Sequence, residues 1–364
     1  MRIDLVITEL ETGGAERCCA ALAIFLQDRG HAVRIISLGP RPIELKMSVV
    51  RSLELAKIEI HFLNGLNWRS FPSVATQLRT LMRRNPPTVV QSFLWHANFA
   101  TALVVPSLKI PLYGGIRVAE RRRWIHRLDR WSASRSTKTI CVSNGVMEWC
   151  VRVEKMDASK LVVIPNGISI AGQPSPIEGR THRVPENARI LLFVGRLDLQ
   201  KGADILIARV PALLRQLPAH HLVLLGDGPL RNAANALGRL PEFSGRIHAL
   251  GLRDDVRAWM ARSERLILPT RFEGMPNVIL EAMAEGLPIV VTRVEGVAEL
   301  LGERTEEQSV DRDDWDGFFR LVVEQSNAVN SKDLGQANRE RALSEFELIK
   351  HLASYESYYR ANEM

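Results

Sequence analysis

The sequence predicts an α/β protein built from two Rossmann-like, doubly wound domains that face a cleft. Short apolar stretches of four to eight residues alternate with longer segments of helical periodicity, which is the pattern of a parallel sheet with crossover helices. This alternation occurs twice, with a segment rich in Pro, Gly and polar residues between the two series. The chain has 364 residues, which suits two hydrophobic cores better than one.

The first series begins with a buried strand over residues 2–8 (RIDLVIT). GGAER (13–17) follows, and then a helix whose apolar residues repeat with helical spacing and which ends at Gly30. Each later strand is a short apolar run, and several are separated by helical stretches. These strands are expected at 31–38, 88–94, 110–116, 138–143 and 160–166.

The second series follows an expected linker at 169–187, so the domains are predicted at 1–168 and 188–342. Its strands are again short and apolar, and most end in Gly, Asp or Thr. A helical segment is expected from about 337 to 359, with 343–364 as a terminal helix. The predicted strands are 189–195, 221–228, 246–251, 265–270 and 287–292.

The charge is unevenly distributed between the halves. Residues 1–168 hold 24 Lys and Arg against 13 Asp and Glu, whereas the rest holds 24 against 28. No acid lies between Glu59 and Glu120. A basic half suggests an anionic partner: nucleic acid, a phosphorylated small molecule or an anionic membrane surface. The alternative is a generically basic surface.

Two basic and aromatic stretches favour the membrane. RTLMRR (79–84) belongs to an amphipathic helix expected from Pro72, and AERRRWIHRLDRW (119–131) is the second stretch. Such faces bind anionic bilayers, although an ordinary domain face is the alternative. No nucleic-acid-binding motif occurs, so no nucleic-acid partner is expected.

The sequence also indicates the compartment. It has no apolar run long enough to cross a membrane, and its N-terminus resembles a strand and not a signal peptide. The four cysteines lack disulfide or metal-site spacing. We therefore expect a cytoplasmic protein, peripheral on the inner face of the membrane.

Several strand ends carry residues suited to an anionic ligand. In GGAER, Gly14 lies in a strand-to-helix turn that lets a ligand approach the backbone, although a tight turn without a ligand is equally consistent. In FVGRLDLQKG, Arg196 and Lys201 follow a buried strand, and two cations there favour a diphosphate. The alternative is a solvated loop.

LLGDGPLR (224–231) is another strand followed by a small polar turn. Gly226 permits close approach of a ligand. Asp227 would accept a hydrogen bond from a ligand hydroxyl, or cap a helix instead.

RFEGMPNVILEAMAEGLPIVV (271–291) combines two acids with a helix start. With Pro276 at the first helical position, the amides of Asn277 and Val278 would face a phosphate. Glu281 lies four residues after Asn277, on the same face, and suits ribose hydroxyls. Glu273 lies before the helix and suits a sugar. The alternative is that Glu273 interacts favourably with the helix dipole and that Glu281 is solvated.

Together these motifs resemble the family-4 retaining glycosyltransferases of the GT-B fold. The resemblance rests on GGAER, FVGR with its following Lys, LLGDGPLR and the paired glutamates of FEGMPNVILEAMAEGLPIV. VIPNGIS, ICVSNGV and VEGVAELL match in type and order. It covers about residues 1–301, and the final helix of this family crosses back to the N-terminal domain.

The resemblance implies a role for each matched position. The C-terminal domain would bind a nucleotide-sugar and the N-terminal domain a glycan or lipid-linked acceptor. Arg196 and Lys201 would neutralise the diphosphate, and Glu273 would position the sugar. No metal or other cofactor is implied. The remaining donor contacts would come from Gly14, Gly226, Asp227, Leu252 near the base, Gly274, Asn277, Val278 and Glu281.

The acceptor side departs from the family. Many relatives carry a histidine after the strand corresponding to PLYGGIR (111–117), where this chain has Arg117, with Glu120 just beyond. His96, in FLWHANF, is a third candidate to contact the acceptor, or else a structural histidine.

Two alternatives stay open at this point. One is a non-catalytic nucleotide-sugar or nucleic-acid binding protein on the same scaffold. The other is a metal-dependent sugar transferase, which the acidic runs at 253–255 and 311–314 would serve; we interpret these runs as surface loops.

Overall fold

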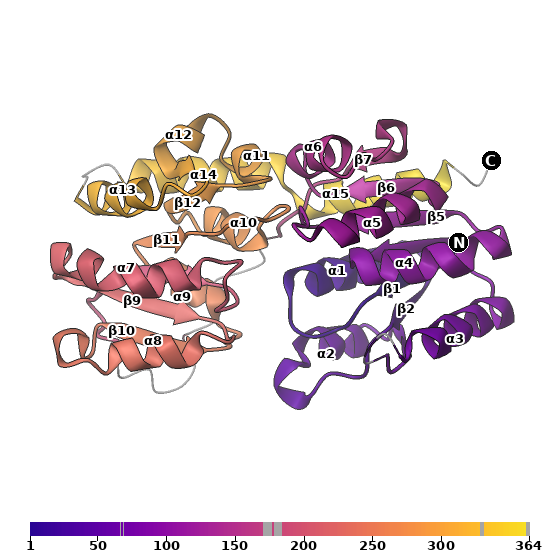
Figure 1. Ribbon diagram of the computed structural model, residues 1–364, viewed down its shortest axis with the longest axis horizontal. Coiled ribbons are helices and arrows are strands. Elements are labelled where there is room, and N and C mark those ends of the chain that lie inside the picture. The colour runs from indigo at the N-terminus through magenta and orange to yellow at the C-terminus, as the bar shows by residue number, and fades with distance from the viewer. Residues whose placement is uncertain (66, 68, 170–176, 178–183, 328–330, 362–364) are drawn as a thin grey trace. The chain divides into compact units, whose positions relative to one another are not determined.

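The computed structural model describes the chain except for residues 66, 68, 170–176, 178–183, 328–330 and 362–364 (Figure 1). The chain forms two compact units. The first comprises Met1–Asn166 with Leu348–Met364, and the second comprises Gly167–Glu347. The expected linker at 169–187 lies largely outside the described residues.

The first unit contains a seven-stranded parallel sheet in the order β3-β2-β1-β4-β5-β6-β7. The interior positions of its central strands are fully buried because helices cover both faces. The strands are β1 (Arg2–Ile7), β2 (Ala32–Ser37), β3 (Glu59–Phe62), β4 (Val89–Phe93), β5 (Leu112–Ile116), β6 (Lys138–Cys141) and β7 (Leu161–Val163).

The helices of this unit follow the strands as crossovers. Two hydrophobic clusters, one on each face of the sheet, join them to it. The helices are α1 (Gly14–Asp28), α2 (Ser48–Leu55), α3 (Phe71–Arg84), α4 (Leu94–Val104), α5 (Arg123–Arg135), α6 (Asn144–Arg152) and α15 (Leu348–Arg360).

The second unit repeats the architecture with a six-stranded parallel sheet in the order β10-β9-β8-β11-β12-β13. Its strands are β8 (Arg189–Val194), β9 (His220–Leu225), β10 (Ile247–Gly251), β11 (Arg265–Leu268), β12 (Ile289–Arg293) and β13 (Ser309–Asp311). Its helices are α7 (Ala203–Gln216), α8 (Arg231–Gly238), α9 (Val256–Arg262), α10 (Asn277–Ala284), α11 (Val297–Leu301), α12 (Thr305–Gln308), α13 (Trp315–Asn327) and α14 (Ser331–Glu345).

All eleven predicted strands are confirmed, with ends that differ by a few residues. Two further strands, β3 and β13, were not predicted, because they are short edge strands with few apolar residues. The segment expected to be helical over 337–359 is helical except for a break, because α14 ends at Glu345 and α15 begins at Leu348. Between them, Glu347 forms an isolated parallel bridge with Ile168, whose amide donates to the Phe346 carbonyl at 2.7 Å.

Each sheet has one point where the strand order reverses. In the first unit it lies between β1 and β4, and in the second between β8 and β11. The loops that leave these two neighbouring strands diverge to opposite faces, which opens a crevice at their carboxyl ends. The residues that follow β1, β4, β8 and β11 therefore have the best placement for a ligand.

The terminal helix α15 belongs to the first unit although it is last in the chain (Figure 1). The Tyr113 hydroxyl donates to the Tyr358 carbonyl at 2.6 Å, and the Tyr359 hydroxyl donates to Gln91 at 3.1 Å. Glu356, which is 3% exposed, contacts His31 at 3.0 Å and Arg29 at 3.2 Å. Polar contacts therefore join α15 to the sheet and to α1.

The described part of the chain contains no helix that is both long and apolar enough to cross a bilayer. None of the four cysteines forms a disulfide.

Glu356 predicts an acid-sensitive contribution to stability. Burial by itself would raise its pKa, but hydrogen bonds from His31 and Arg360 and the charge of Arg29 outweigh it and lower the pKa to about 2. This stabilisation is complete above the unfolded pKa of 4.5 and is lost as the pH falls towards 2. We expect Glu356→Gln to lower the free energy of unfolding at pH 7 by about 1–3 kcal/mol, measured from urea unfolding.

The matched control is Glu54→Gln, which removes the exposed pair with Arg41 in the same unit. Its effect should stay within about 0.5 kcal/mol. Equal losses in the two variants at pH 7, or a Glu356→Gln difference unchanged between pH 5 and pH 3, would contradict this account.

Candidate functional site

The clearest polar constellation lies at the switch point of the second unit. Lys201 follows β8 and Glu273 follows β11, and their Nζ and Oε1 atoms are 2.5 Å apart. The side chains are 20% and 7% exposed, so the pair is mostly removed from solvent. Two loops that are 72 residues apart in sequence are joined at the position where the sheet opens.

Glu273 is held by more than Lys201. The Thr270 hydroxyl donates to Glu273 Oε1 at 3.0 Å. Thr292 at the end of β12 donates to the Thr270 carbonyl, which ties the next strand to the same loop. The carboxylate is therefore fixed in one position. The sequence analysis missed Thr270, because a threonine at a strand end has no distinctive pattern.

Asp198 is a second residue that the sequence analysis missed. Its Oδ2 pairs with Arg196 Nε at 2.8 Å, and its Oδ1 accepts from the Lys201 backbone amide at 3.0 Å. Asp198 therefore organises the loop that carries both predicted cations. The Arg196 side chain is 73% exposed, and its guanidinium pairs with Asp198, whereas the Lys201 ammonium pairs with Glu273.

The glycines at these strand ends serve packing between turns. A Cβ on Gly226 would lie 2.0 Å from the Gly195 carbonyl oxygen, and one on Gly296 would lie 2.3 Å from the Gly274 oxygen. Both glycines also have a positive φ. Close approach of a ligand is therefore not the only reason for glycine at position 226, because the neighbouring backbone already excludes a side chain there.

Asp227 contacts its own loop. It accepts from the Gly228 amide at 2.9 Å and from Arg231 at 3.3 Å. The capping alternative is wrong, because α8 begins after Leu230, which makes no side-chain cap. Leu252, expected near the base, follows β10 and is 40% exposed.

The start of α10 differs from the prediction by one position. Pro276 is the N-cap and Asn277 is the first helical residue. The amides of Ile279 and Leu280 bond to the Pro276 carbonyl, so those of Asn277 and Val278 precede the first helical hydrogen bonds. Proline suits this place because it has no amide proton. The contacts of these amides with a phosphate stay a prediction.

Two further donor candidates lie around this helix. Glu281 is half-buried one turn beyond Asn277, whereas Gly274 is buried in the turn that precedes the helix. Their roles towards ribose and phosphate stay predictions. Gly14, the remaining donor candidate, is the first residue of α1 in the other unit.

The acceptor candidates lie in the first unit and are only partly brought together. Arg117 follows β5, is 9% exposed, donates to Asn166, and interacts electrostatically with Tyr355. Glu120 instead accepts from Arg122 at 2.9 and 2.8 Å and from two amides of its own loop. The predicted arginine and acid therefore have separate partners.

His96 occupies the first turn of α4, directly after β4. Partial burial, assisted by the charge of Arg122, lowers its pKa to about 4. The imidazole is therefore neutral at physiological pH. Its ring stacks against that of Trp95, with centroids 3.4 Å apart.

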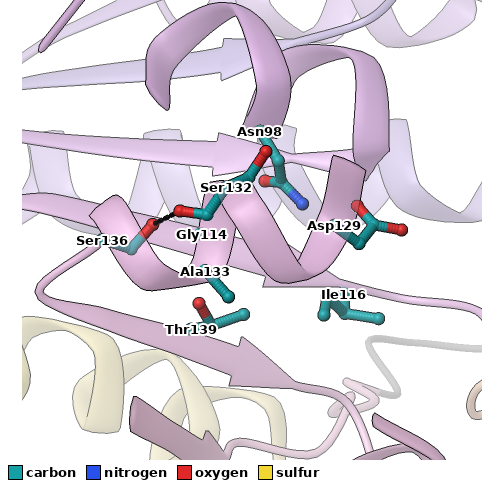
Figure 2. Close-up of a pocket in the computed structure, with 8 residues that line it drawn as sticks. All are labelled: Asn98, Gly114, Ile116, Asp129, Ser132, Ala133, Ser136 and Thr139. Carbon is teal, nitrogen blue, oxygen red and sulfur yellow. Dashed lines mark hydrogen bonds between the residues drawn. The ribbon is translucent and has the colours of Figure 1, made fainter. Parts of the chain in front are cut away.

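A small cavity lies between the sheet of the first unit and α4 and α5 (Figure 2). It does not admit a water molecule. Polar side chains from three elements line it, including Asn98, Asp129 and Ser136, and the last of these donates back to its own helix. Burial, together with the charges of Glu154 and Glu120, raises the pKa of Asp129 well above its usual value. We interpret the cavity as a packing feature.

The acidic runs considered for a metal have internal partners. Asp255 makes a two-point ion pair with Arg253, and Asp311 lies 3.6 Å from Arg293. Within the described residues, no group of three or more His, Cys, Asp or Glu side chains is arranged to hold a metal ion. The expectation of metal-independent chemistry stays a prediction.

Comparison with known proteins agrees with this geometry. Residues 12–171 match the family described as Glycosyltransferase Family 4, and residues 188–325 match Glycosyl transferases group 1. The two matches together span most of both units. The chain belongs to these glycosyltransferases and has their GT-B fold.

Individual relatives are distant. The chain is 28% identical to the lipopolysaccharide core biosynthesis glycosyltransferase LpsE of Rhizobium meliloti (strain 1021), over 88% of this chain and 87% of LpsE. It is 24% identical to UDP-Gal:alpha-D-GlcNAc-diphosphoundecaprenol alpha-1,3-galactosyltransferase of Escherichia coli, over 70% of this chain and 69% of the relative. The structure of Anabaena HepE in complex with UDP-glucose superposes with a TM-score of 0.81 at 17% identity, covering 98% and 100% of the two chains.

The packing between turns predicts that one glycine is needed to hold the Lys201 loop against the Glu273 loop. Gly202 precedes α7 at φ +70°, and a Cβ there would lie 1.7 Å from the Pro269 carbonyl oxygen. We expect Gly202→Ala to separate the Lys201 loop from the Glu273 loop. The free energy of unfolding should fall by at least about 3 kcal/mol, from backbone strain plus overpacking.

Gly286→Ala is the matched control, because Gly286 has φ +74° but its nearest contact would be 3.7 Å away. It should lose only the strain, about 1–2 kcal/mol. Chemical unfolding of both variants makes the comparison, and equal losses would show that the turn contact is unimportant.

Proposed function

We propose that this protein transfers a hexose-type sugar from a nucleotide-sugar, UDP- or GDP-linked, to a glycan or lipid-linked acceptor, with retention of anomeric configuration. The observation that carries this proposal is the Lys201–Glu273 pair at the switch point of the second unit. A cation for the diphosphate and a fixed carboxylate for the sugar lie side by side there, as the donor requires.

The chemistry follows from the charges. When the bond between the anomeric carbon and the diphosphate breaks, negative charge grows on the leaving oxygen. Lys201 and Arg196 stabilise that charge, and the first-turn amides of α10 at Asn277 and Val278 add to it. These groups replace a metal ion in the proposal. Glu273 accepts hydrogen bonds from the sugar and orients its anomeric carbon.

The ion pair also explains how a buried carboxylate tolerates a diphosphate next to it. An unpaired Glu273 carboxylate would repel the diphosphate of the donor, whereas the Lys201 ammonium at 2.5 Å neutralises the carboxylate. When the donor binds, Lys201 can share its three donor protons between the carboxylate and a phosphate oxygen. Glu281, one turn further on, is placed for the ribose hydroxyls.

The relatives support the substrate classes in the proposal. HepE was solved with UDP-glucose, and the Escherichia coli relative is named for a UDP-sugar donor and a diphosphoundecaprenol-linked acceptor. LpsE is named for lipopolysaccharide core synthesis. We accordingly place this protein in cell-surface glycan synthesis, in the cytoplasm and at the inner face of the membrane.

A donor panel tests the proposal. UDP- and GDP-sugars are screened by thermal shift, and those that bind are assayed for nucleotide release and for the anomer of the product by NMR. Binding with retained configuration in the product supports the proposal. Inversion refutes retention, and binding of a donor without turnover toward water or any acceptor favours the non-catalytic alternative.

Loss of either member of the central pair should abolish most of the activity. We expect Lys201→Ala or Glu273→Ala to lower turnover by at least about 100-fold, which is about 2.7 kcal/mol of barrier. Steady-state nucleotide release measures it. The control is Arg209→Ala, which breaks the exposed pair with Asp316 in the same unit and should keep wild-type turnover. Wild-type rates in either site variant would refute the assignment.

A basic and aromatic face on the first unit supports the membrane part of the proposal. Helices α3, α4 and α5 pack side by side. Trp124 on α5 is 49% exposed, and the Arg122 guanidinium lies 5.9 Å from its ring. Arginines are exposed at positions 83 and 84, which end α3, and at positions 122, 123, 127 and 130, at the start of α5 and along it. Such a surface attracts anionic lipid headgroups and inserts an indole at the interface.

Vesicle binding should depend on these charges. The wild-type protein should co-sediment with vesicles of phosphatidylglycerol and phosphatidylcholine, and 0.5 M salt should reduce it. Replacing Arg123, Arg127 and Arg130 by Glu should abolish it. The same change of charge at Arg209, Arg239 and Arg320 in the second unit is the control. Salt-insensitive sedimentation, or an equal loss of vesicle binding in both triple variants, would refute the role of this face in membrane binding.

A further inference from the structure

The first turn of α1 contains a buried carboxyl group that the sequence motifs did not assign. Gly13 is the N-cap of α1 in an extended conformation, and Glu16 lies in the first turn. Glu16 is only 7% exposed. A Cβ on Gly13 would lie 2.1 Å from Glu16 Oε2, so the carboxyl group folds over the bare Cα of this glycine. Gly13 therefore makes room for a carboxyl group.

This carboxyl group lies at the switch point of the first unit. The helix α1 follows β1, and its counterpart α4 follows β4, the strand next to β1 on the other side of the reversal. Glu16 thus has the same position relative to its sheet as the Lys201 loop has in the second unit. By the general rule for open parallel sheets, a ligand of this unit binds at the same crevice.

Backbone strain marks the opposite side of that crevice. Leu94, the first residue of α4, has φ +70°, which costs a bulky side chain about 1–2 kcal/mol. Strain of this kind persists mainly where function requires it. In this chain it sets the turn that carries Trp95 and His96 away from β4.

A mostly buried cation, Arg117, exerts its charge on Glu16. Arg117 donates to Asn166, its charge interacts with Tyr355 on α15, and its guanidinium lies 5.8 Å from the Phe93 ring centre. Phe93 is the last residue of β4, and Arg117 and Asn166 follow the carboxyl ends of β5 and β7. Among ion pairs between described residues, none joins Arg117 to a carboxylate, and its charge acts on Glu16.

We propose that Glu16 is the acceptor-side carboxylate of this transferase, and that it accepts a hydrogen bond from the hydroxyl of the acceptor that receives the sugar. Arg117 and Tyr355 are positioning residues: α15 supplies Tyr355, Tyr355 and Asn166 orient Arg117, and Arg117 favours the ionised form of Glu16. This inference rests on the proposed transferase function. It identifies the contact that neither Glu120 nor His96 accounts for.

The surroundings of Glu16 give this contact a pH dependence. Burial raises its pKa to about 7, the charges of Glu9 and Glu11 act in the same direction, and Arg117 opposes them. The other titratable groups here are Cys18 and Cys19 on α1 and Tyr355 on α15. Lys46 pairs with Glu11 at 2.6 Å. Because the carboxylate accepts the hydroxyl hydrogen bond, acceptor use should increase as the pH rises through about 7.

The test compares two buried glutamates. Glu154, in the same unit, is 3% exposed and also has a pKa raised to about 7 by burial, but it follows α6 and not a switch-point strand. With the donor selected by the panel and GlcNAc-diphosphoundecaprenol as probe acceptor, kcat/KM for the acceptor is measured from pH 6 to 8.5. Release of nucleotide to water is measured in parallel.

We expect Glu16→Gln to lower acceptor kcat/KM by about 30-fold or more and to abolish its rise near pH 7, with donor KM unchanged. Glu154→Gln should keep the wild-type profile. Gln preserves the shape of Glu16 over Gly13, and circular dichroism checks the fold. A wild-type acceptor profile in Glu16→Gln, or equal changes in both variants, overturns the inference.

Tyr355→Phe keeps the proposal testable if Glu16→Gln does not fold. Removing the hydroxyl frees Arg117, so less positive charge acts on Glu16 and the midpoint of the pH profile should move upward. An unchanged midpoint overturns the positioning role. If the wild-type protein neither transfers to the probe nor releases nucleotide, the proposed function itself fails. Transfer by the wild-type protein together with wild-type behaviour of Glu16→Gln overturns this inference alone.

Discussion

The ion pair between Lys201 and Glu273 is the constraint around which the second unit is arranged. The pair joins the loop after β8 to the loop after β11, which are the loops that diverge where the sheet order reverses. Without it, the carboxylate at the crevice would be buried and uncompensated, which is costly. Asp198 orients one loop and Thr270 the other, so each partner of the pair has its own support.

The same loops depend on backbone contacts that exclude side chains. Gly202 lies against Pro269, Gly226 against Gly195, and Gly296 against Gly274. In each case a carbonyl oxygen of one turn occupies the space that a Cβ of the other would need. Glycine is common at strand ends of nucleotide-binding folds because it lets a ligand approach the backbone. Here the contact with the neighbouring turn by itself already requires glycine.

The first unit uses the corresponding position differently. Its switch point has a buried carboxyl group and a mostly buried guanidinium, where the second unit has the Lys201–Glu273 pair. The last helix of the chain contributes Tyr355 to this cluster and Glu356 to the ion pairs beside it. This region is therefore formed only when α15 packs against it, although α15 lies more than 300 positions after α1 in the sequence.

The sequence by itself determined the two parallel sheets and the cations and acids at the ends of β8 and β11, because strand periodicity and motif spacing are local properties. It did not determine the supports. Thr270, Asp198 and Glu16 are common residue types that bond or pack within three positions of themselves, and no sequence pattern singles them out. The break between α14 and α15 also has no local signal, because Glu347 leaves the helix to pair with Ile168. Only the tertiary structure decided these features, since the loops that Asp198 and Thr270 hold meet through Lys201 and Glu273, 72 residues apart, and Glu347 meets Ile168 from the other end of the second unit.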